Sequence, residues 1–186
     1  VVKLIGEDQA NLMNDPVYRE LDGIYLRDCK IAKSISNYAT VNARSDLAKS
    51  VKLFEYVIRT IRYSQDHMGW IPHAPEQRVD VPLTLYDLCL LGFGTTQDRA
   101  WLFSALLRQI GLDSVLIFPE SGNQAQGFGG HMLMGVIIGQ QVYLFDLHDG
   151  VPIPGPAGVA ETPDKPSVAI LEEVTAHPEL FRQLDP

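Results

Sequence analysis

The chain has 186 residues, of which 46% are hydrophobic and 20% charged, as in an ordinary globular domain with a hydrophobic core. Its formal net charge of -8 argues against nucleic acid or an anionic membrane surface as the main partner. No apolar run approaches the length of a membrane span, and two cysteines, Cys29 and Cys89, allow at most one disulfide. Because the chain begins Val-Val-Lys, we expect a segment of a longer protein, and its localisation stays open.

Three helices are predicted in the first half of the chain. Asn14-Asp15-Pro16 combines a capping residue with an early proline, which predicts a helix from there to about residue 36. The residues expected on its inner side are Leu21, Ile24, Tyr25 and Ile31. Apolar residues spaced alternately by four and three predict a second helix at 45–63. A long loop at 64–82 separates it from a third helix at 84–91.

The next helix, 97–110, is expected to be the most buried one. Thr95 can cap it, and Asp98 follows three residues later, the spacing of a capping box with Asp in place of the usual Glu. Its apolar residues cover more than one stripe, so most of its faces should be covered by other elements. Arg99 and Arg108 are expected on solvated or salt-bridged faces of this helix.

The pattern changes from helix-like to strand-like after this helix. Strands are predicted at 114–118, 132–138 and 142–147, and we expect them to form one antiparallel sheet against the 97–110 helix. Gly139-Gln140-Gln141 separates the last two strands, which is a hairpin signal.

The C-terminal part of the chain contains many prolines and glycines between 149 and 166, which predicts an irregular path over the surface. A last helix is expected at about 167–176. We therefore divide the chain into an N-terminal helical extension at 1–44, a core at 45–150, and a Pro-rich tail with the C-terminal helix at 151–186. All three are expected to form one compact unit.

The stretch from Gly92 to Gly111 reads as a glycine-rich turn, a nucleophile position, x-Asp-x-Ala and a run ending Leu-Leu-Arg-x-x-Gly. It resembles the core motif of the transglutaminase-like domain, and the likeness covers roughly residues 45–150. The resemblance implies an α+β, papain-like fold, with helices packed on a small antiparallel sheet, and a Cys, His, Asp triad. Gly130-His131 and Asp146 match the second and third positions, whereas Thr96 stands at the position of the Cys.

This replacement changes the chemistry that the resemblance implies. In the active family, the His deprotonates the Cys, the Asp orients the His, and the thiolate attacks a carbonyl to form an acyl-enzyme. A thiol has a free pKa of about 8.5, which falls beside an imidazolium and a helix N-terminus. The hydroxyl of Thr96 is much less acidic, and Thr95 or Thr96 can instead serve as a helix cap. His131 and Asp146 would then be relics that brace the hairpin.

The turn between the last two strands decides whether His131 and Asp146 share a face. If Gly139-Gln140 is a two-residue turn, Leu133 lies opposite Asp146, and His131 lies opposite His148. Asp146 is then one diagonal away from His131, roughly 7–8 Å between backbones. A three-residue turn would shift the register by one and move Asp146 to the other face. The resemblance favours the two-residue turn.

Other residues could contribute to the site. Thr95, Trp70 and Gly130 could line it, although packing is also a sufficient role for Trp70. Cys89 is a candidate stand-in nucleophile, although its position between two leucines is typical of a buried thiol. The histidines at 67, 73, 131 and 148 lack the spacing of a metal-ligand motif, so we expect neither metal nor cofactor.

Three functions stay open at this stage. The resemblance and the missing Cys favour a catalytically inactive transglutaminase-like domain in a larger protein, whose former cleft binds a peptide or a protein partner. The rival is an active amide hydrolase or acyltransferase that uses Thr96 or Cys89 with His131 and Asp146. The third is a purely structural module with a closed cleft.

Overall fold

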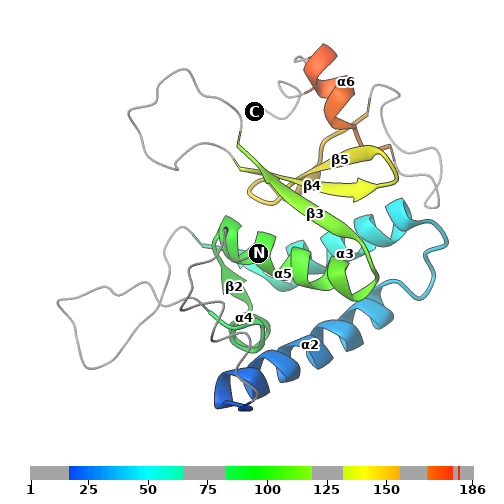
Figure 1. The fold of residues 1–186 in the computed structure, drawn as a ribbon. Coiled ribbons are helices and arrows are strands. Elements are labelled where there is room, and N and C mark those ends of the chain that lie inside the picture. Colours follow the sequence, from blue (N-terminus) through cyan, green and yellow to red (C-terminus); the bar gives the residue numbers. More distant parts are fainter. Residues whose placement is uncertain (1–16, 65–82, 119–131, 156–166, 178–179, 181–186) are drawn as a thin grey trace, which may run out of the picture.

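The computed structural model describes residues 17–64, 83–118, 132–155, 167–177 and 180. Within them the elements are, in order, α2 (Glu20–Ala39), α3 (Asp46–Thr60), β1 (Arg62–Tyr63), α4 (Leu85–Leu91), β2 (Phe93–Gly94), α5 (Thr96–Gln109), β3 (Asp113–Ile117), β4 (Leu133–Ile138), β5 (Gln141–Asp146), β6 (Val151–Pro152) and α6 (Leu171–Ala176). Figure 1 shows α5 and α3 packed under one face of the sheet formed by β3, β4 and β5, with α2 below them and α6 on the opposite face. The fold is therefore mixed, with helices on both sides of an antiparallel sheet.

Helix α2 packs against α5 through small side chains. Its buried residues are Asp28, Ala32 and Ser36, spaced by four, and Ser36 Oγ donates a hydrogen bond of 2.9 Å to the carbonyl of Leu106. The inner side expected from the sequence is wrong in the first part of the helix, since Leu21 is 74% exposed and other large residues there are exposed as well. Small residues allow a close helix contact, so they define the buried stripe in place of the large apolar ones.

The second helix begins where the sequence predicts. Ser45 caps α3, because its hydroxyl accepts a 3.1 Å hydrogen bond from the N–H of Ala48. The helix ends at Thr60, short of the predicted 63, because Arg62–Tyr63 forms β1 and pairs in parallel with Phe93–Gly94 in β2. This two-stranded link holds the end of α3 against the start of α5.

Helix α5 lies at the centre of the core, as predicted. Seven of its fourteen residues are buried, a larger share than in any other helix of the described segments. Phe103 on its inner side contacts Phe54 of α3 and Phe145 of β5, with ring centroids 5.8 Å and 5.4 Å apart. These rings join the helices and the sheet in one hydrophobic core.

The sheet has the strand order β3-β4-β5-β6, and all its neighbours are antiparallel. The two-residue turn is confirmed, because Ile138 pairs with Gln141, Leu133 pairs with Asp146, and Gly139 has a φ of 64°. A positive φ at the first turn position suits glycine, which has no Cβ.

Residues 149–155, the described start of the Pro- and Gly-rich segment, differ from the irregular path that the composition predicts, whereas 156–166 lie outside the described residues. Val151–Pro152 adds the short strand β6 to the sheet, so the sheet continues past the predicted boundary at 150. The last helix begins at Leu171 and not at 167, because Val168 and Ile170 form bridges with Pro154 and Tyr143. Val and Ile suit such extended positions. No helix in the described part of the chain is long and apolar enough to cross a membrane.

Candidate functional site at the start of α5

The first turn of α5 carries the capping box that the sequence predicts. Thr95 Oγ1 accepts a 3.3 Å hydrogen bond from the N–H of Asp98, and Asp98 Oδ2 accepts a 2.8 Å bond from the N–H of Thr95. Two further N–H groups, those of Thr96 and Gln97, have no acceptor among the residues that the structure describes. Because the positive end of the helix dipole lies here, this end of α5 favours acceptor or anionic groups.

Thr96 meets a histidine at this helix end, and that histidine is His148. Thr96 Oγ1 lies 3.3 Å from His148 Nδ1. The imidazole packs edge-on against the ring of Tyr63, with centroids 4.6 Å apart, and its Nε2 lies 3.9 Å from a carboxylate oxygen of Asp149. A hydroxyl, an imidazole and a carboxylate therefore follow one another from α5 to the turn after β5.

Asp146 stabilises the backbone of the turn that carries His148. Its carboxylate is fully buried, and Oδ1 accepts hydrogen bonds from the N–H groups of His148 and Asp149 at 2.8 Å and 3.0 Å. Asp146 therefore fixes the backbone that carries the histidine. Its pairing with Leu133 is the register that the predicted triad requires, although His131 itself lies outside the described residues, as do Gly130 and Trp70.

Arg99 corrects the expectation of a solvated face. It is 5% exposed, and its guanidinium donates to the carbonyl of Ile61 at 2.8 Å and 3.0 Å and to that of Leu147 at 2.8 Å. A weaker bond of 3.4 Å reaches the carbonyl of His148. Burial lowers the pKa of Arg99 from its ordinary value, and the nearby Tyr63 opposes that shift. The side chain joins the start of α5 to the end of α3 and the turn after β5.

A signal for this buried arginine was present in the sequence. Position 99 lies three, four and seven residues before Leu102, Phe103 and Leu106, which places it on the same helix face as buried core residues. His148 gave a weaker signal, because only the turn register placed it near the site. Its contact with Thr96 depends on how the sheet packs on α5.

Cys89 does not accompany Thr96 in this arrangement. It is a free, half-buried thiol on α4, and burial raises its pKa, with the negative charge of Asp28 as a smaller cause. Its other electrostatic neighbour is Tyr56 on α3. A raised pKa disfavours the thiolate, so this environment does not activate Cys89 as a nucleophile.

A cavity opens beside the first turns of α5. It has a volume of about 210 Å³, lies between α5 and the strands β3 and β4, and begins at Gln97, the residue after Thr96. Trp101, Leu116 and Met132 contribute to its largely apolar lining. The surface next to Thr96 is therefore hollowed.

No family model, curated protein or solved structure matches this chain. In the described segments, no three His, Cys, Asp or Glu side chains gather closely enough to hold a metal ion.

Proposed function

We propose that this chain is a transglutaminase-like domain that lacks acyl-transfer activity and binds a peptide or protein at the surface around the start of α5. One observation carries the proposal: Thr96 occupies the motif's nucleophile position, at an open helix N-terminus, 3.3 Å from an imidazole. The helix N-terminus and the imidazole, which would lower the pKa of a thiol at this position, face a hydroxyl instead.

The hydroxyl argues against catalysis on chemical grounds. An imidazole removes a proton from a thiol far more readily than from an aliphatic alcohol, because the two pKa values differ by several units. The side chain of His148 is also 41% exposed, so water competes for its nitrogens. The adjacent cavity and the free N–H groups of α5 still offer a binding surface.

A second candidate function is supported by the same contact. Serine and threonine hydroxyls act as nucleophiles when a base lies within hydrogen-bond reach. The 3.3 Å contact between Thr96 and His148, with Asp149 near the far nitrogen, is compatible with a weak amide hydrolase or acyltransferase. Turnover of a simple ester such as p-nitrophenyl acetate that disappears in Thr96→Ala would favour this candidate.

Restoring the thiol tests the proposal. In a Cys29→Ala/Cys89→Ala background, Thr96→Cys places a thiol at the helix N-terminus beside His148, and its pKa should fall well below about 8.5. The rate of alkylation by iodoacetamide, measured against pH, should therefore show a low midpoint that His148→Ala raises.

A thiol at the other end of the same helix provides the matched control. Gln109→Cys lies in the last turn of α5, where the dipole favours a cation, so its midpoint should stay at or above the ordinary value. If Thr96→Cys titrates like Gln109→Cys and does not respond to His148→Ala, the site has lost the arrangement that the resemblance implies. A structural module would then be the better description.

A further inference from the structure

One face of α5 is left outside the core. Gln97, Trp101, Ser104 and Arg108 follow at intervals of four, three and four, so they form one stripe along the helix. Trp101 is 47% exposed in this otherwise well-buried helix. The stripe lines two cavities of about 210 Å³ each, and both cavities share Trp101 and Ser104. We call this feature the α5 groove.

One wall of the α5 groove is the edge strand β3. Leu116 of β3 and Met134 of β4 are opposite each other and face α5 across the first cavity. Val115 and Leu116 are 39% and 50% exposed. Among the described strands, only β4 pairs with β3, so the outer N–H and C=O groups of β3 have no strand partner. An extended chain can satisfy such an edge with main-chain hydrogen bonds.

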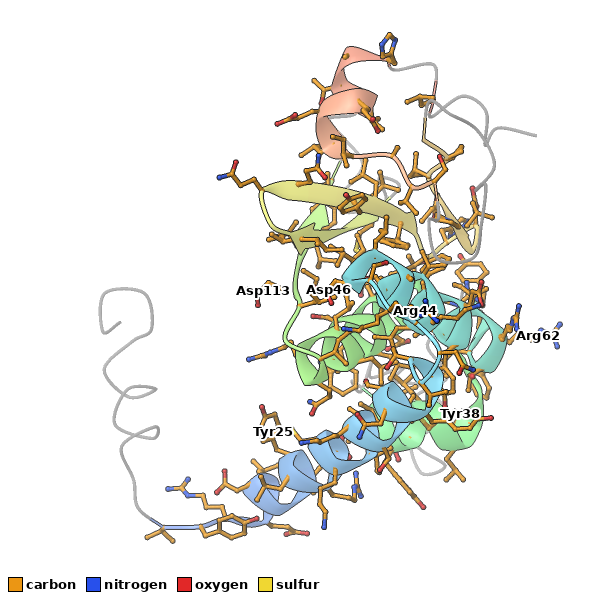
Figure 2. All side chains as sticks on the ribbon, turned by 90° about the vertical axis from the view of Figure 1, so that its right-hand side faces the viewer. Tyr25, Tyr38, Arg44, Asp46, Arg62 and Asp113 are labelled. Atoms are coloured by element: carbon orange, nitrogen blue, oxygen red, sulfur yellow. The ribbon has the colours of Figure 1, made fainter. Side chains whose placement is uncertain are left out.

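The other wall is α2, which borders the second cavity. Tyr25, Cys29 and Ala32 line it, and Figure 2 shows Tyr25 rising from α2 on the side of α5. Arg108 lies at this end of the groove and is exposed. Within the described residues, no carboxylate lies within 4 Å of its guanidinium. Asp28 also lines this cavity, but its two oxygens are bound by Arg27 and by the N–H of Leu85. Among the described residues of this chain of net charge -8, Arg108 is therefore a positive charge in the hollow without a carboxylate partner.

The dimensions of the groove fix the spacing of a ligand. Gln97 and Arg108 are eleven residues apart, which corresponds to about 16 Å along a helix that rises 1.5 Å per residue. An extended chain covers that length in about five residues. The first cavity accommodates an apolar side chain, and Arg108 accommodates a carboxylate, which it can bind with two hydrogen bonds.

We propose that the α5 groove binds an extended segment of a partner protein, with an apolar residue in the first cavity and an acidic residue about four or six positions away at Arg108, since only an even separation places both side chains on one face. This proposal rests on the binding function above and names its ligand class. The free edge of β3 selects an extended main chain, Trp101 provides the central apolar contact, and Arg108 sets the charge. Aromatic and arginine residues of this kind often contribute most of the energy of an interface.

A heptapeptide display library, selected on the 186-residue chain, tests the proposal. Selected peptides should share an acidic and an apolar residue about four or six positions apart. Trp101→Ala should weaken their binding at least about tenfold in fluorescence polarisation. Arg108→Glu should reverse the charge preference, so that a new selection enriches basic residues at the same position.

One control variant and one stability measurement make the outcome decisive. Arg59→Glu changes an arginine on α3 that is 80% exposed and does not line the groove, so it should leave binding unchanged. Thermal melting of each variant checks that the fold survives, which is expected because Trp101 and Arg108 are exposed.

Three results would overturn the proposal. If the bulky change Thr96→Trp abolishes binding of the selected peptides while Trp101→Ala and Arg108→Glu do not, the peptides bind at the start of α5. The proposal of a ligand in the α5 groove is then wrong. If no peptide is enriched, the groove and the peptide-binding function both fail. If light scattering shows a dimer that Trp101→Ala dissociates, the occupant is a second copy of this chain.

Discussion

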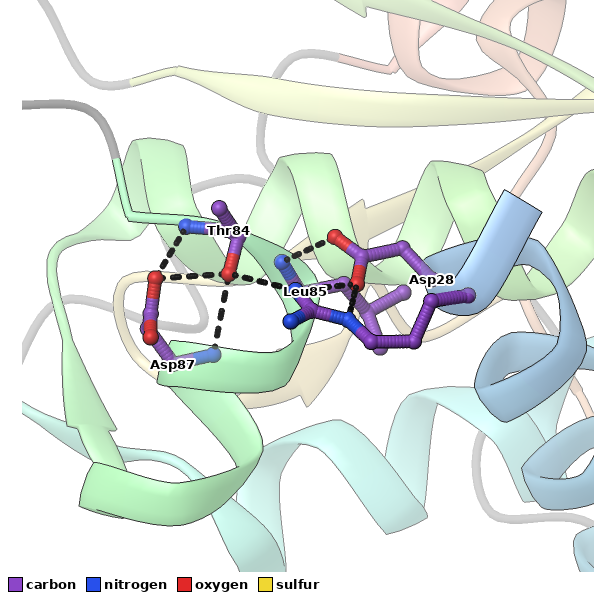
Figure 3. Close-up of polar contacts among 5 residues, drawn as sticks. Asp28, Thr84, Leu85 and Asp87 are labelled. Atoms are coloured by element: carbon purple, nitrogen blue, oxygen red, sulfur yellow. Dashed lines mark hydrogen bonds and ion pairs between the residues drawn. The ribbon is translucent and has the colours of Figure 1, made fainter. Parts of the chain in front are cut away.

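Helices α4 and α5 begin with the same capping chemistry but have different surroundings. Thr84 and Asp87 form a capping box on α4 with a 3.1 Å bond from the N–H of Thr84, and Thr95 and Asp98 form the equivalent on α5 at 2.8 Å. On α4, however, the next N–H, that of Leu85, donates to a carboxylate from α2 at 3.2 Å. Figure 3 shows this carboxylate reaching the helix end beside the capping box.

That carboxylate closes the start of α4. Asp28 is 8% exposed, and Arg27 holds its other oxygen at 2.8 Å. The equivalent residue on α5, Thr96, meets no acidic side chain among the described residues and contacts His148 instead. A capping box therefore starts a helix in both cases, and the neighbour decides whether that helix end is sealed or available. A capping box alone therefore does not mark a helix end as a binding site.

Removing the hydrogen bonds of Arg99 beneath the start of α5 should have the largest effect on stability. Arg99→Met removes the hydrogen bonds to the buried carbonyls of Ile61 and Leu147, which would then lack a donor. Leaving such groups unsatisfied costs 1–3 kcal/mol each, so the free energy of unfolding should fall by about 3 kcal/mol. Urea unfolding measures this loss. Arg108→Met, an exposed arginine on the same helix, is the control and should change stability little; equal effects would contradict the role of Arg99.

Removing the carboxylate of Asp28 from the start of α4 tests the comparison of the two helix ends directly. Asp28→Ala removes the acceptor of Leu85 N–H and the partner of Arg27, which makes the start of α4 resemble that of α5. The expected cost is about 1–2 kcal/mol, the range for losing a capping carboxylate. Asp28→Asn keeps an oxygen acceptor and should lose less in the same urea titration. Stability unaffected by either change would show that the contact does not hold α4.

The smallest effect concerns the thiol of Cys89 on α4. Cys89 lies within α4 with a raised pKa, so iodoacetamide should label it more slowly than a free cysteine at the same pH. Because the folded pKa is the higher one, its contribution to stability is complete below the ordinary thiol pKa and is lost as pH rises toward the raised value. Asp28→Asn should bring the midpoint down, since Asp28 is its second cause. Rapid labelling of Cys89 near pH 7 would disprove this.

Local rules in the sequence predict much of the fold. Two of these rules act within a few neighbouring residues. Thr95 and Asp98 have the three-residue spacing of a capping box, and Gly139 suits the first position of the Gly139-Gln140 turn. They predict the start of α5 and the register of β4 and β5 from local chemistry alone. The papain-like likeness of the whole remains a prediction from the resemblance.

Packing decides the features that the sequence did not predict. Val168 and Ile170 lie in a segment whose composition permits a helix, yet they form isolated β-bridges with Pro154 and Tyr143. Arg99 carries a charge that usually indicates solvent, yet it donates to carbonyls at the end of α3 and in the turn after β5. Thr96 was found from its motif, whereas its partner His148 is brought there by the packing of the sheet on α5. Candidate residues on one element were therefore easier to find than contacts between elements.

The hydrogen bonds that hold the backbone of His148 determine how its side chain can move. Asp146 holds its N–H, and Arg99 holds its carbonyl, so the backbone at this position is fixed on both sides. The ring can then leave or approach Thr96 only by rotation about its own side-chain bonds, past the edge of Tyr63. Rotamer exchange of exposed side chains takes picoseconds to nanoseconds, whereas loop hinges are far slower. The contact at the start of α5 can thus open and close for an incoming group without any change in the fold.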